Sequence, residues 1–353
     1  MITIKNLIDE FIQHSPEFYS DTELQSVDSK HTDILNEAYK QFGDSNLYNQ
    51  MNFRDWKEQT DYGVPAQLSI NNIKQSGFWH AFVKYAYRKL FKYGEDKSLR
   101  STIHDDMEII KMVGAGDLLN DNPVHLTPGA KKFFIVDGVT VNIRWLRYVY
   151  LLKRILDLEV LTNESVWLDV GSFYGGLQGL VRKYSPKTRI VMVDFHHQLC
   201  RSFIYLSKMY PDATHIFPDQ VQQYSNFREM PQGAIVYVPV SDYEKLPAQS
   251  VDLFSNFFSF GEMKKYFFKI YTNSKIFKES ENAYLVNRFV SAPFFEKTYD
   301  SELSILDYFN SSKSLEYFDV FPMHHYMLVR RDLFGRKGYR NISSSYFEMV
   351  LST

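Results

Sequence analysis

Apolar residues recur at helical spacing along much of the amino-terminal part of the chain. Such spacing puts the apolar side chains on one face of a helix that packs against a core. Helices are predicted over about residues 4–12, 34–42, 78–93 and 144–158. Asp137-Gly138 lies between two short apolar runs and predicts a β-hairpin. Residues 114–129 are rich in Gly, Asn, Asp and Pro, which predicts a loop.

From about residue 166, short apolar runs alternate with segments of helical length. The runs cover residues 166–170, 190–193, 235–240, 251–254 and 283–286. An uninterrupted apolar run is typical of a strand buried on both faces, and its alternation with helices favours a parallel sheet with right-handed crossovers. The sequence therefore predicts an α/β fold. A doubly wound, mostly parallel, Rossmann-like sheet is expected over residues 141–353, preceded by a mainly helical region over residues 1–140.

Beyond residue 300 the alternation of strand and helix stops. Residues 315–321 and 326–331 are rich in apolar and aromatic side chains, and Pro322-Met323-His324-His325 separates them. We expect these two segments to pair as antiparallel strands at an edge of the sheet.

The amino-acid composition disfavours some classes of binding partner and indicates the cellular compartment. Of 353 residues, 44% are hydrophobic and 23% charged, and a net charge of −2 lacks the positive field that nucleic acids or anionic membranes attract. The single Cys200 excludes an intramolecular disulfide, and no Cys/His cluster has zinc spacing. No apolar stretch reaches the ~18 residues of a membrane span. We therefore expect a cytoplasmic protein that binds neither nucleic acid nor membranes.

A glycine-containing loop follows the first buried run. Gly171 and Gly175-Gly176 let a ligand approach the backbone at the start of a helix, but their spacing lacks the G-x-G-x-x-G of a dinucleotide site. Asp169 precedes this loop, where it would repel a diphosphate and attract a cation. Asp194 ends the next run and can accept hydrogen bonds from both ribose hydroxyls. The pattern indicates an adenosine cofactor with a positively charged end that carries no phosphate.

This combination resembles the class I S-adenosylmethionine-dependent methyltransferases over about residues 165–290. The resemblance implies S-adenosyl-L-methionine as the cofactor, with its methionine part at the glycine loop, its ribose at Asp194 and its adenine near Asp242. The cofactor-binding residues predicted in this way are Asp169, Gly171, Ser172, Tyr174, Gly175, Asp194, Asp242 and Asn256.

A second motif, Asn256-x-x-Ser259-x-x-Glu262-Met263, follows the fourth buried run. It resembles the signature of a family of sugar O-methyltransferases found among polysaccharide-modifying enzymes. The Asn142-x-Arg-x-x-Arg-Tyr segment, the Asn122-Pro123 loop and Asn287-Arg288 support this likeness, which runs over about residues 115–330. The substrate-binding residues that it implies are Arg144, Arg147, Tyr148, Ser259, Asn287 and Arg288.

Methyl transfer to a sugar hydroxyl benefits from a positioned base, because the hydroxyl is a weak acid. The candidates are Glu262, His324 and His325, with His196 or His197 as further possibilities. A carboxylate and a histidine could instead hold Mg²⁺ that polarises the hydroxyl, so the use of a divalent metal stays open.

The sequence therefore predicts a cytoplasmic O-methyltransferase that acts on a nucleotide-linked sugar or a glycan unit, in polysaccharide or secondary-metabolite biosynthesis. Residues 1–140 would cap the acceptor side, and a homo-oligomer is compatible with the sequence. Two alternatives remain open at this point. One is a nicotinamide-dependent sugar oxidoreductase, and the other is a non-catalytic binding protein with the same fold.

Overall fold

The computed structural model describes residues 4–15, 79, 101–127, 133–246, 251–291, 303–309, 312–323, 326–330, 337–341 and 346–353. The chain divides into two compact units. The first comprises residues 1–44, 151–322 and 344–353, and the second comprises residues 45–150 and 323–343. Among the described residues, no helix is long and apolar enough to cross a lipid bilayer.

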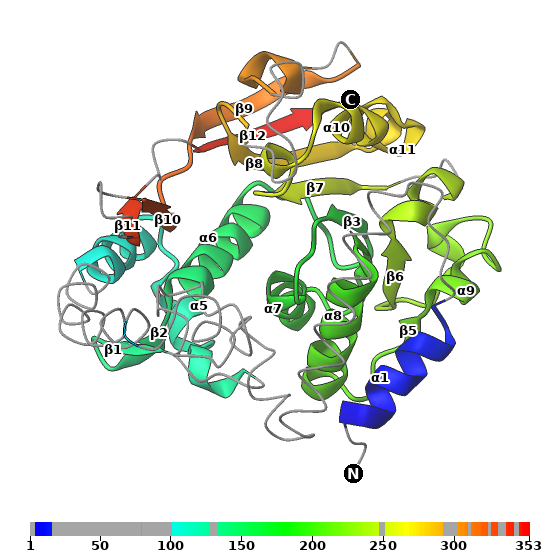
Figure 1. Ribbon diagram of the computed structural model, residues 1–353, viewed down its shortest axis with the longest axis horizontal. Coiled ribbons are helices and arrows are strands. Elements are labelled where there is room, and N and C mark those ends of the chain that lie inside the picture. The colour runs from blue at the N-terminus through cyan, green and yellow to red at the C-terminus, as the bar shows by residue number, and fades with distance from the viewer. Residues whose placement is uncertain are drawn as a thin grey trace. The chain divides into compact units, whose positions relative to one another are not determined.

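An eight-stranded sheet forms the centre of the first unit in the described part of the chain (Figure 1). From edge to edge its strands are β5 (His215–Ile216), β6 (Ile235–Pro239), β4 (Arg189–Asp194), β3 (Val166–Val170), β7 (Leu253–Phe257), β8 (Asn282–Arg288), β12 (Tyr346–Ser352) and β9 (Ser314–Val320). All neighbours are parallel except β12, which is antiparallel to both β8 and β9. The predicted doubly wound, mostly parallel, Rossmann-like sheet is confirmed.

The strands are buried on both faces because helices cover both. Every residue of β3, β4, β6 and β7 is buried. Successive side chains of a strand point to opposite faces. Val166, Leu168 and Val170 pack in one core with side chains of α10 (Lys265–Asn273) and α11 (Lys275–Glu279). The intervening Asp169 contacts α7 (Gly176–Tyr184), so α7 lies on the opposite face.

Helix α8 (His196–Met209) packs on β4 and β6, and the amino-terminal helix α1 (Ile4–Gln13) packs on α8 (Figure 1). Phe11 of α1 is 2% exposed and packs against both Phe203 and Phe217. Helix α1 was predicted from its apolar spacing and is confirmed. The predicted helix over residues 34–42 lies outside the described residues, and so does that over 78–93 except at position 79.

The predicted pairing of residues 315–321 with 326–331 is wrong. The first segment forms β9, which pairs with β12, whereas the second forms β10 (Tyr326–Arg330), which pairs with β11 (Lys337–Asn341) in a separate two-stranded sheet. Strand β12 was not predicted, because Glu348 interrupts its buried apolar run.

Glu348 is tolerated inside β12 because distant side chains satisfy its carboxylate. It is fully buried and accepts hydrogen bonds from Arg154 Nε at 2.9 Å and from the Tyr284 hydroxyl at 3.0 Å. The Arg154 guanidinium also stacks 4.7 Å from the ring centroid of Tyr317. A buried carboxylate is stable only with such partners.

In the second unit, the predicted hairpin is confirmed as β1 (Phe134–Val136) and β2 (Val139–Val141). Its turn residues, Asp137 and Gly138, have φ values of 50° and 82°, which suit a tight hairpin turn. The long helix α6 (Ile143–Asp157), which begins in the second unit and continues into the first, is also confirmed. Within the predicted loop 114–129, the structure forms the short helix α5 (Gly116–Asn120) and a 3₁₀ turn at Val124–Leu126. The predicted domain boundary near residue 140 stays a prediction.

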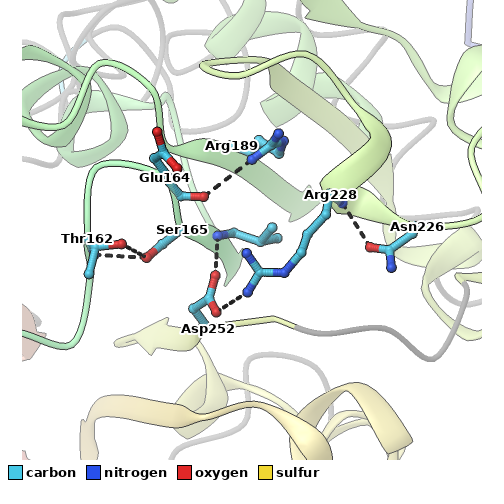
Figure 2. Close-up of polar contacts among 8 residues, drawn as sticks. Thr162, Glu164, Ser165, Arg189, Asn226, Arg228 and Asp252 are labelled. Carbon is cyan, nitrogen blue, oxygen red and sulfur yellow. Dashed lines mark hydrogen bonds and ion pairs between the residues drawn. The ribbon is translucent and has the colours of Figure 1, made fainter.

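Figure 2 shows a polar network at the amino ends of the central strands. Asp252, just before β7, accepts a hydrogen bond from the Val166 N–H at 2.7 Å and forms an ion pair with Arg228. Arg189, at the start of β4, donates to the Met230 carbonyl at 2.7 Å and to the Glu164 carbonyl at 3.3 Å. The network fixes the starts of β3, β4 and β7.

Replacing Asp252 by alanine is therefore expected to lower the free energy of unfolding by about 1–3 kcal/mol, because the Val166 N–H and Arg228 both lose their acceptor. Chemical denaturation followed by circular dichroism measures this loss. Asp212, an exposed acid of the same unit, provides the control, and Asp212→Ala should change stability by no more than about 0.5 kcal/mol. Equal stability of the two variants would contradict the role given to Asp252.

Candidate functional site

The strand order places the topological switch point of the sheet between β3 and β7. The chain continues from β3 to β4 on one side and later enters β7 on the other. In open α/β sheets, ligands bind beyond the carboxyl ends of the strands at such a point. The two loops that meet there are residues 171–175 after β3 and residues 258–262 after β7. These are the two loops that carry the predicted cofactor and acceptor motifs.

Close packing explains the glycine at position 171. Gly171 has φ +80°, and a Cβ atom placed on it would lie 2.2 Å from Ser259 Oγ. Its N–H donates to the Val193 carbonyl at 2.8 Å, which ties the loop to β4. Ser172 Oγ donates to the backbone carbonyl of Asp169 at 3.0 Å. The predicted cofactor and acceptor motifs are therefore in direct contact through Gly171 and Ser259.

Gly175 forms the start of α7 and has φ +84°. A Cβ atom there would lie 3.1 Å from Leu206 Cδ1, so this glycine allows α7 to approach α8 closely. The preceding Tyr174 is 1% exposed, and its ring packs 5.0 Å from that of Tyr205. Tyr174 thus contributes to the interior, and its predicted contact with the cofactor stays a prediction.

Phe173 was not predicted as a site residue, yet it determines the shape of the loop. Its φ of 57° is left-handed, a conformation that costs energy for a bulky side chain and is often found at functional sites. Its N–H donates to Asp194 Oδ2 at 2.8 Å, and its carbonyl accepts from Ser202 Oγ at 2.6 Å. The Arg201 guanidinium lies 5.2 Å from its ring centroid. No residue-type signal in the sequence indicates this conformation.

Asp194 joins the glycine loop to the end of β4. The backbone N–H of Phe173 donates to Asp194 Oδ2, and the backbone N–H of Phe195 donates to Asp194 Oδ1, both at 2.8 Å. The residue is 8% exposed. Each carboxylate oxygen has two acceptor sites, so these bonds leave acceptor capacity for further donors. Asp194 therefore holds the loop, and its predicted contact with the ribose hydroxyls stays a prediction.

Asp169 is buried beneath the glycine loop, with 2% of its surface exposed. Its Oδ1 accepts from Ser255 Oγ and its Oδ2 from Gln178 Nε2, both at 2.5 Å. Burial raises the pKa of this carboxyl to about 8, and the negative charge of Asp194 acts in the same direction. The predicted role of Asp169 beside a cationic cofactor thus depends on its protonation state. Gln178 and Ser255 were not predicted as site residues.

Two fully buried amides, Asn256 and Asn287, shape the turn after β7. Asn256 donates to the Val170 carbonyl at 2.7 Å and to Ser259 Oγ at 2.6 Å. It accepts from the Phe260 N–H at 2.9 Å and from Asn287 Nδ2 at 3.0 Å. Asn287 in turn accepts from the Gly261 N–H at 3.1 Å. Both side chains therefore position the turn, and their predicted contacts with the cofactor and the acceptor stay predictions.

The turn presents Glu262 beside Arg288 of β8. The Glu262 side chain is 48% exposed, and its Oε1 lies 3.5 Å from Arg288 Nη2. Arg288 is 7% exposed and also donates from Nε to the Tyr346 hydroxyl at 2.8 Å. Phe258, with a left-handed φ of 76°, packs its ring on Phe321 and Tyr346. The structure thus brings the predicted base and the predicted anion-binding arginine together.

Asp242 lies in a 3₁₀ turn, Val240–Lys245, directly after β6. Pro239, the last residue of β6, is paired with Asp194 at the end of β4. Asp242 comes three residues after Pro239, so it lies beyond the same edge of the sheet as Asp194. Its carboxylate is ion-paired with Lys245 at 2.6 Å. This position is compatible with the predicted place beside the adenine.

The other predicted residues lie elsewhere. Arg144, Arg147 and Tyr148 belong to the second unit, where Arg147 is 5% and Tyr148 is 7% exposed. Two of these side chains are buried, and the predicted contact of the segment with the substrate stays a prediction. The candidate bases His324 and His325 lie outside the described residues. His196 begins α8. No group of three or more metal-ligating side chains occurs among the residues that the structure describes.

No protein-family model and no curated protein matches the sequence. The fold is similar to that of several solved structures. A proposed RNA methyltransferase from Pyrococcus horikoshii matches with 15% identity and a TM-score of 0.35, over 59% of this chain and 83% of its own. The small RNA methyltransferase HEN1 matches with 13% identity and a TM-score of 0.35, over 63% of this chain and 27% of its own. The pyocyanin biosynthetic protein PhzM matches with 11% identity and a TM-score of 0.31, over 59% and 58%.

At this level of similarity the matches assign no activity to this chain. Its function has to be inferred from its own residues.

Proposed function

We propose that this protein is an S-adenosylmethionine-dependent O-methyltransferase that acts on a sugar hydroxyl. The observation that carries the proposal is the contact between Gly171 and Ser259 at the switch point of the sheet. It brings the predicted cofactor loop and the predicted acceptor turn within van der Waals distance. A methyl donor held by one loop would then face an acceptor held by the other.

The residues at the strand ends fit an adenosine cofactor with a cationic end. Asp194 offers a partly accessible carboxylate at the end of β4 for ribose hydroxyls, and Asp169 supplies a second acid beneath the loop at the end of β3. Gly171 and Gly175 leave room for Ser259 and Leu206, so the loop of residues 171–175 keeps the tight shape in which its backbone would approach the cofactor. When bound, the cofactor supplies an electrophilic methyl group on a sulfonium centre.

The residues of this chain would then align and deprotonate the acceptor. Alignment of a hydroxyl behind the methyl group contributes most of the rate, and a positioned base adds ~10²–10⁴-fold. Glu262 is the described residue best placed for proton removal, because it is accessible at the end of β7 and held by Arg288. Arg288 would also contact a carboxylate or phosphate on the acceptor, as on a nucleotide-linked sugar.

Ligand binding tests the cofactor assignment. We expect S-adenosylmethionine and S-adenosylhomocysteine to bind at micromolar concentration or below and to raise the melting temperature, whereas NAD and NADP should do neither, because the loop lacks a diphosphate cradle. Isothermal titration calorimetry and thermal-shift assays measure both effects. Binding of NAD without a response to S-adenosylhomocysteine would favour the sugar oxidoreductase instead.

Methyl transfer tests the acceptor assignment. A panel of nucleotide-linked sugars, an RNA oligonucleotide and a phenol should be incubated with methyl-labelled S-adenosylmethionine. We expect label in a sugar only. Label in RNA or the phenol would contradict the sugar assignment, and cofactor binding without transfer to any acceptor would favour a non-catalytic binding protein.

A further inference from the structure

The pair formed by Asp169 and Gln178 contains an unsatisfied atom. Gln178, on the first turn of α7, is 1% exposed, and its Nε2 lies 2.5 Å from Asp169 Oδ2. Its other amide atom, Oε1, is buried and has no hydrogen-bond partner among the residues that the structure describes. A buried carbonyl oxygen without a donor is costly. The separation of 2.5 Å between Gln178 Nε2 and Asp169 Oδ2 is also shorter than the ~2.7–3.2 Å of an N–H···O bond. This short distance favours a second arrangement of the pair, whereas the unpartnered position is occupied by an amide atom in either orientation.

Rotation of the Gln178 amide by 180° exchanges its oxygen and nitrogen, which have nearly the same shape. Oε1 would then face Asp169 Oδ2 at the same short distance. Two oxygens approach so closely only when a proton lies between them. A protonated Asp169 would donate to Gln178 Oε1, and the carboxyl would keep its bond from Ser255 on the other oxygen.

The surroundings of Asp169 favour the neutral form in the absence of a ligand. The carboxyl faces Gln178 from α7, Ser255 from β7 and Ser172 from the loop, all uncharged, and the Asp194 carboxylate from β4. Burial and Asp194 both raise the pKa of Asp169, and the hydrogen bonds of the neutral side chains only partly oppose this. Among the described residues that shift this pKa, none is cationic.

We propose that Asp169 is protonated in the ligand-free protein, bonded to Gln178, and that it releases this proton when a cationic group binds at the carboxyl end of β3. The inference rests on the proposed function, in which that group is the sulfonium or the ammonium of S-adenosylmethionine. The O–H bond of Asp169 breaks, its electron pair stays on the carboxylate, and the proton passes to the buffer. Binding of the methyl donor thereby replaces a buried neutral acid by a buried ion pair.

Calorimetry in buffers of different ionisation enthalpy counts the protons released on binding. At pH 6.5 we expect S-adenosylmethionine to release about one proton per molecule bound, since a group with a pKa of about 8 is then almost fully protonated. Its affinity should correspondingly rise up to about tenfold per pH unit between pH 6 and 7. S-adenosylhomocysteine keeps the ammonium but lacks the sulfonium. Proton release on its binding would identify the ammonium as the group that displaces the proton, and binding without release would identify the sulfonium. Uncharged 5′-methylthioadenosine should release none.

Asp169→Asn keeps the shape of the neutral side chain and should abolish the release. Ser255→Ala leaves Asp169 in place and removes a donor that favours its ionised form. The pKa of Asp169 should therefore rise, and proton release on ligand binding should persist to a higher pH than in the parent protein. Infrared spectroscopy of the ligand-free protein at pH 6.5 provides an independent measurement. The carboxylic-acid C=O stretch of the parent protein should be weaker in Asp169→Asn.

Binding of S-adenosylmethionine with the same proton release in the parent protein and in Asp169→Asn would overturn the inference and leave the proposed function standing. An unchanged infrared band in Asp169→Asn would also overturn it. Failure of all three adenosine ligands to bind would instead overturn the proposed function, and the inference with it.

Discussion

Replacement of Asp194 by alanine is expected to weaken binding of S-adenosylhomocysteine by about 10²–10⁴-fold. Two ribose hydroxyls would lose a charged acceptor, and each such hydrogen bond contributes about 1.5–3 kcal/mol. The substitution also removes the acceptor of the Phe173 N–H, which holds the loop in its left-handed conformation. The expected loss therefore combines a direct contact with the shape of the glycine loop. Calorimetric titration of the purified variant measures the dissociation constant.

Two controls separate these contributions from misfolding. Asp212→Ala removes an exposed acid of the same unit and should leave the affinity unchanged. The melting temperature of ligand-free Asp194→Ala shows whether the fold persists. A folded Asp194→Ala variant with unchanged affinity would place the adenosine elsewhere on the protein.

Glu262→Gln is expected to reduce turnover by at least ~10²-fold while leaving cofactor affinity nearly unchanged, because a general base acts only in the transition state. Glutamine has the same size and can still accept a hydrogen bond from Arg288, so the turn should keep its shape. Turnover is measured with labelled S-adenosylmethionine and the acceptor found in the panel above.

Glu281→Gln is the matched control, because Glu281 is exposed just before β8, at the opposite end of the sheet. His324→Ala and His325→Ala test the other candidate bases. Turnover that survives a chelator, collapses in Glu262→Gln and persists in both histidine variants would support the carboxylate as the base. Full activity in all three variants would contradict every base assignment and leave alignment as the main source of rate.

The strands and the glycine loop of the site could be predicted because each of them is encoded by a short, continuous stretch of the sequence. The buried runs of β3, β4, β6, β7 and β8 are continuous in sequence, and the glycines after β3 are recognisable by type. Parallel strands bring their carboxyl ends to one sheet edge, so the neighbourhood of residues 171–175 and 258–262 followed from the topology.

The functions of the buried amides could not be predicted in the same way. Asn256 and Asn287 are separated by 31 residues, and only their pairing across β7 and β8 shows that they bond to each other and to the turn. The sequence marks them as polar residues after strands, which is equally compatible with ligand contact. Hydrogen bonding inside the protein shows that both amides position the turn, and their contacts with cofactor and acceptor stay predictions.

The sequence by itself determined the doubly wound sheet and the position of the glycine loop after β3, because apolar runs, glycines and acids at strand ends express short-range constraints. Tertiary structure alone decided the insertion of β12 between β8 and β9, since Glu348 is stable there only through Arg154 and Tyr284, which are 194 and 64 residues away. It alone also decided the left-handed backbone of Phe173 and the burial of Asp169. These features depend on partners far apart in the chain, whose contacts set the backbone strain and the dielectric environment of each group.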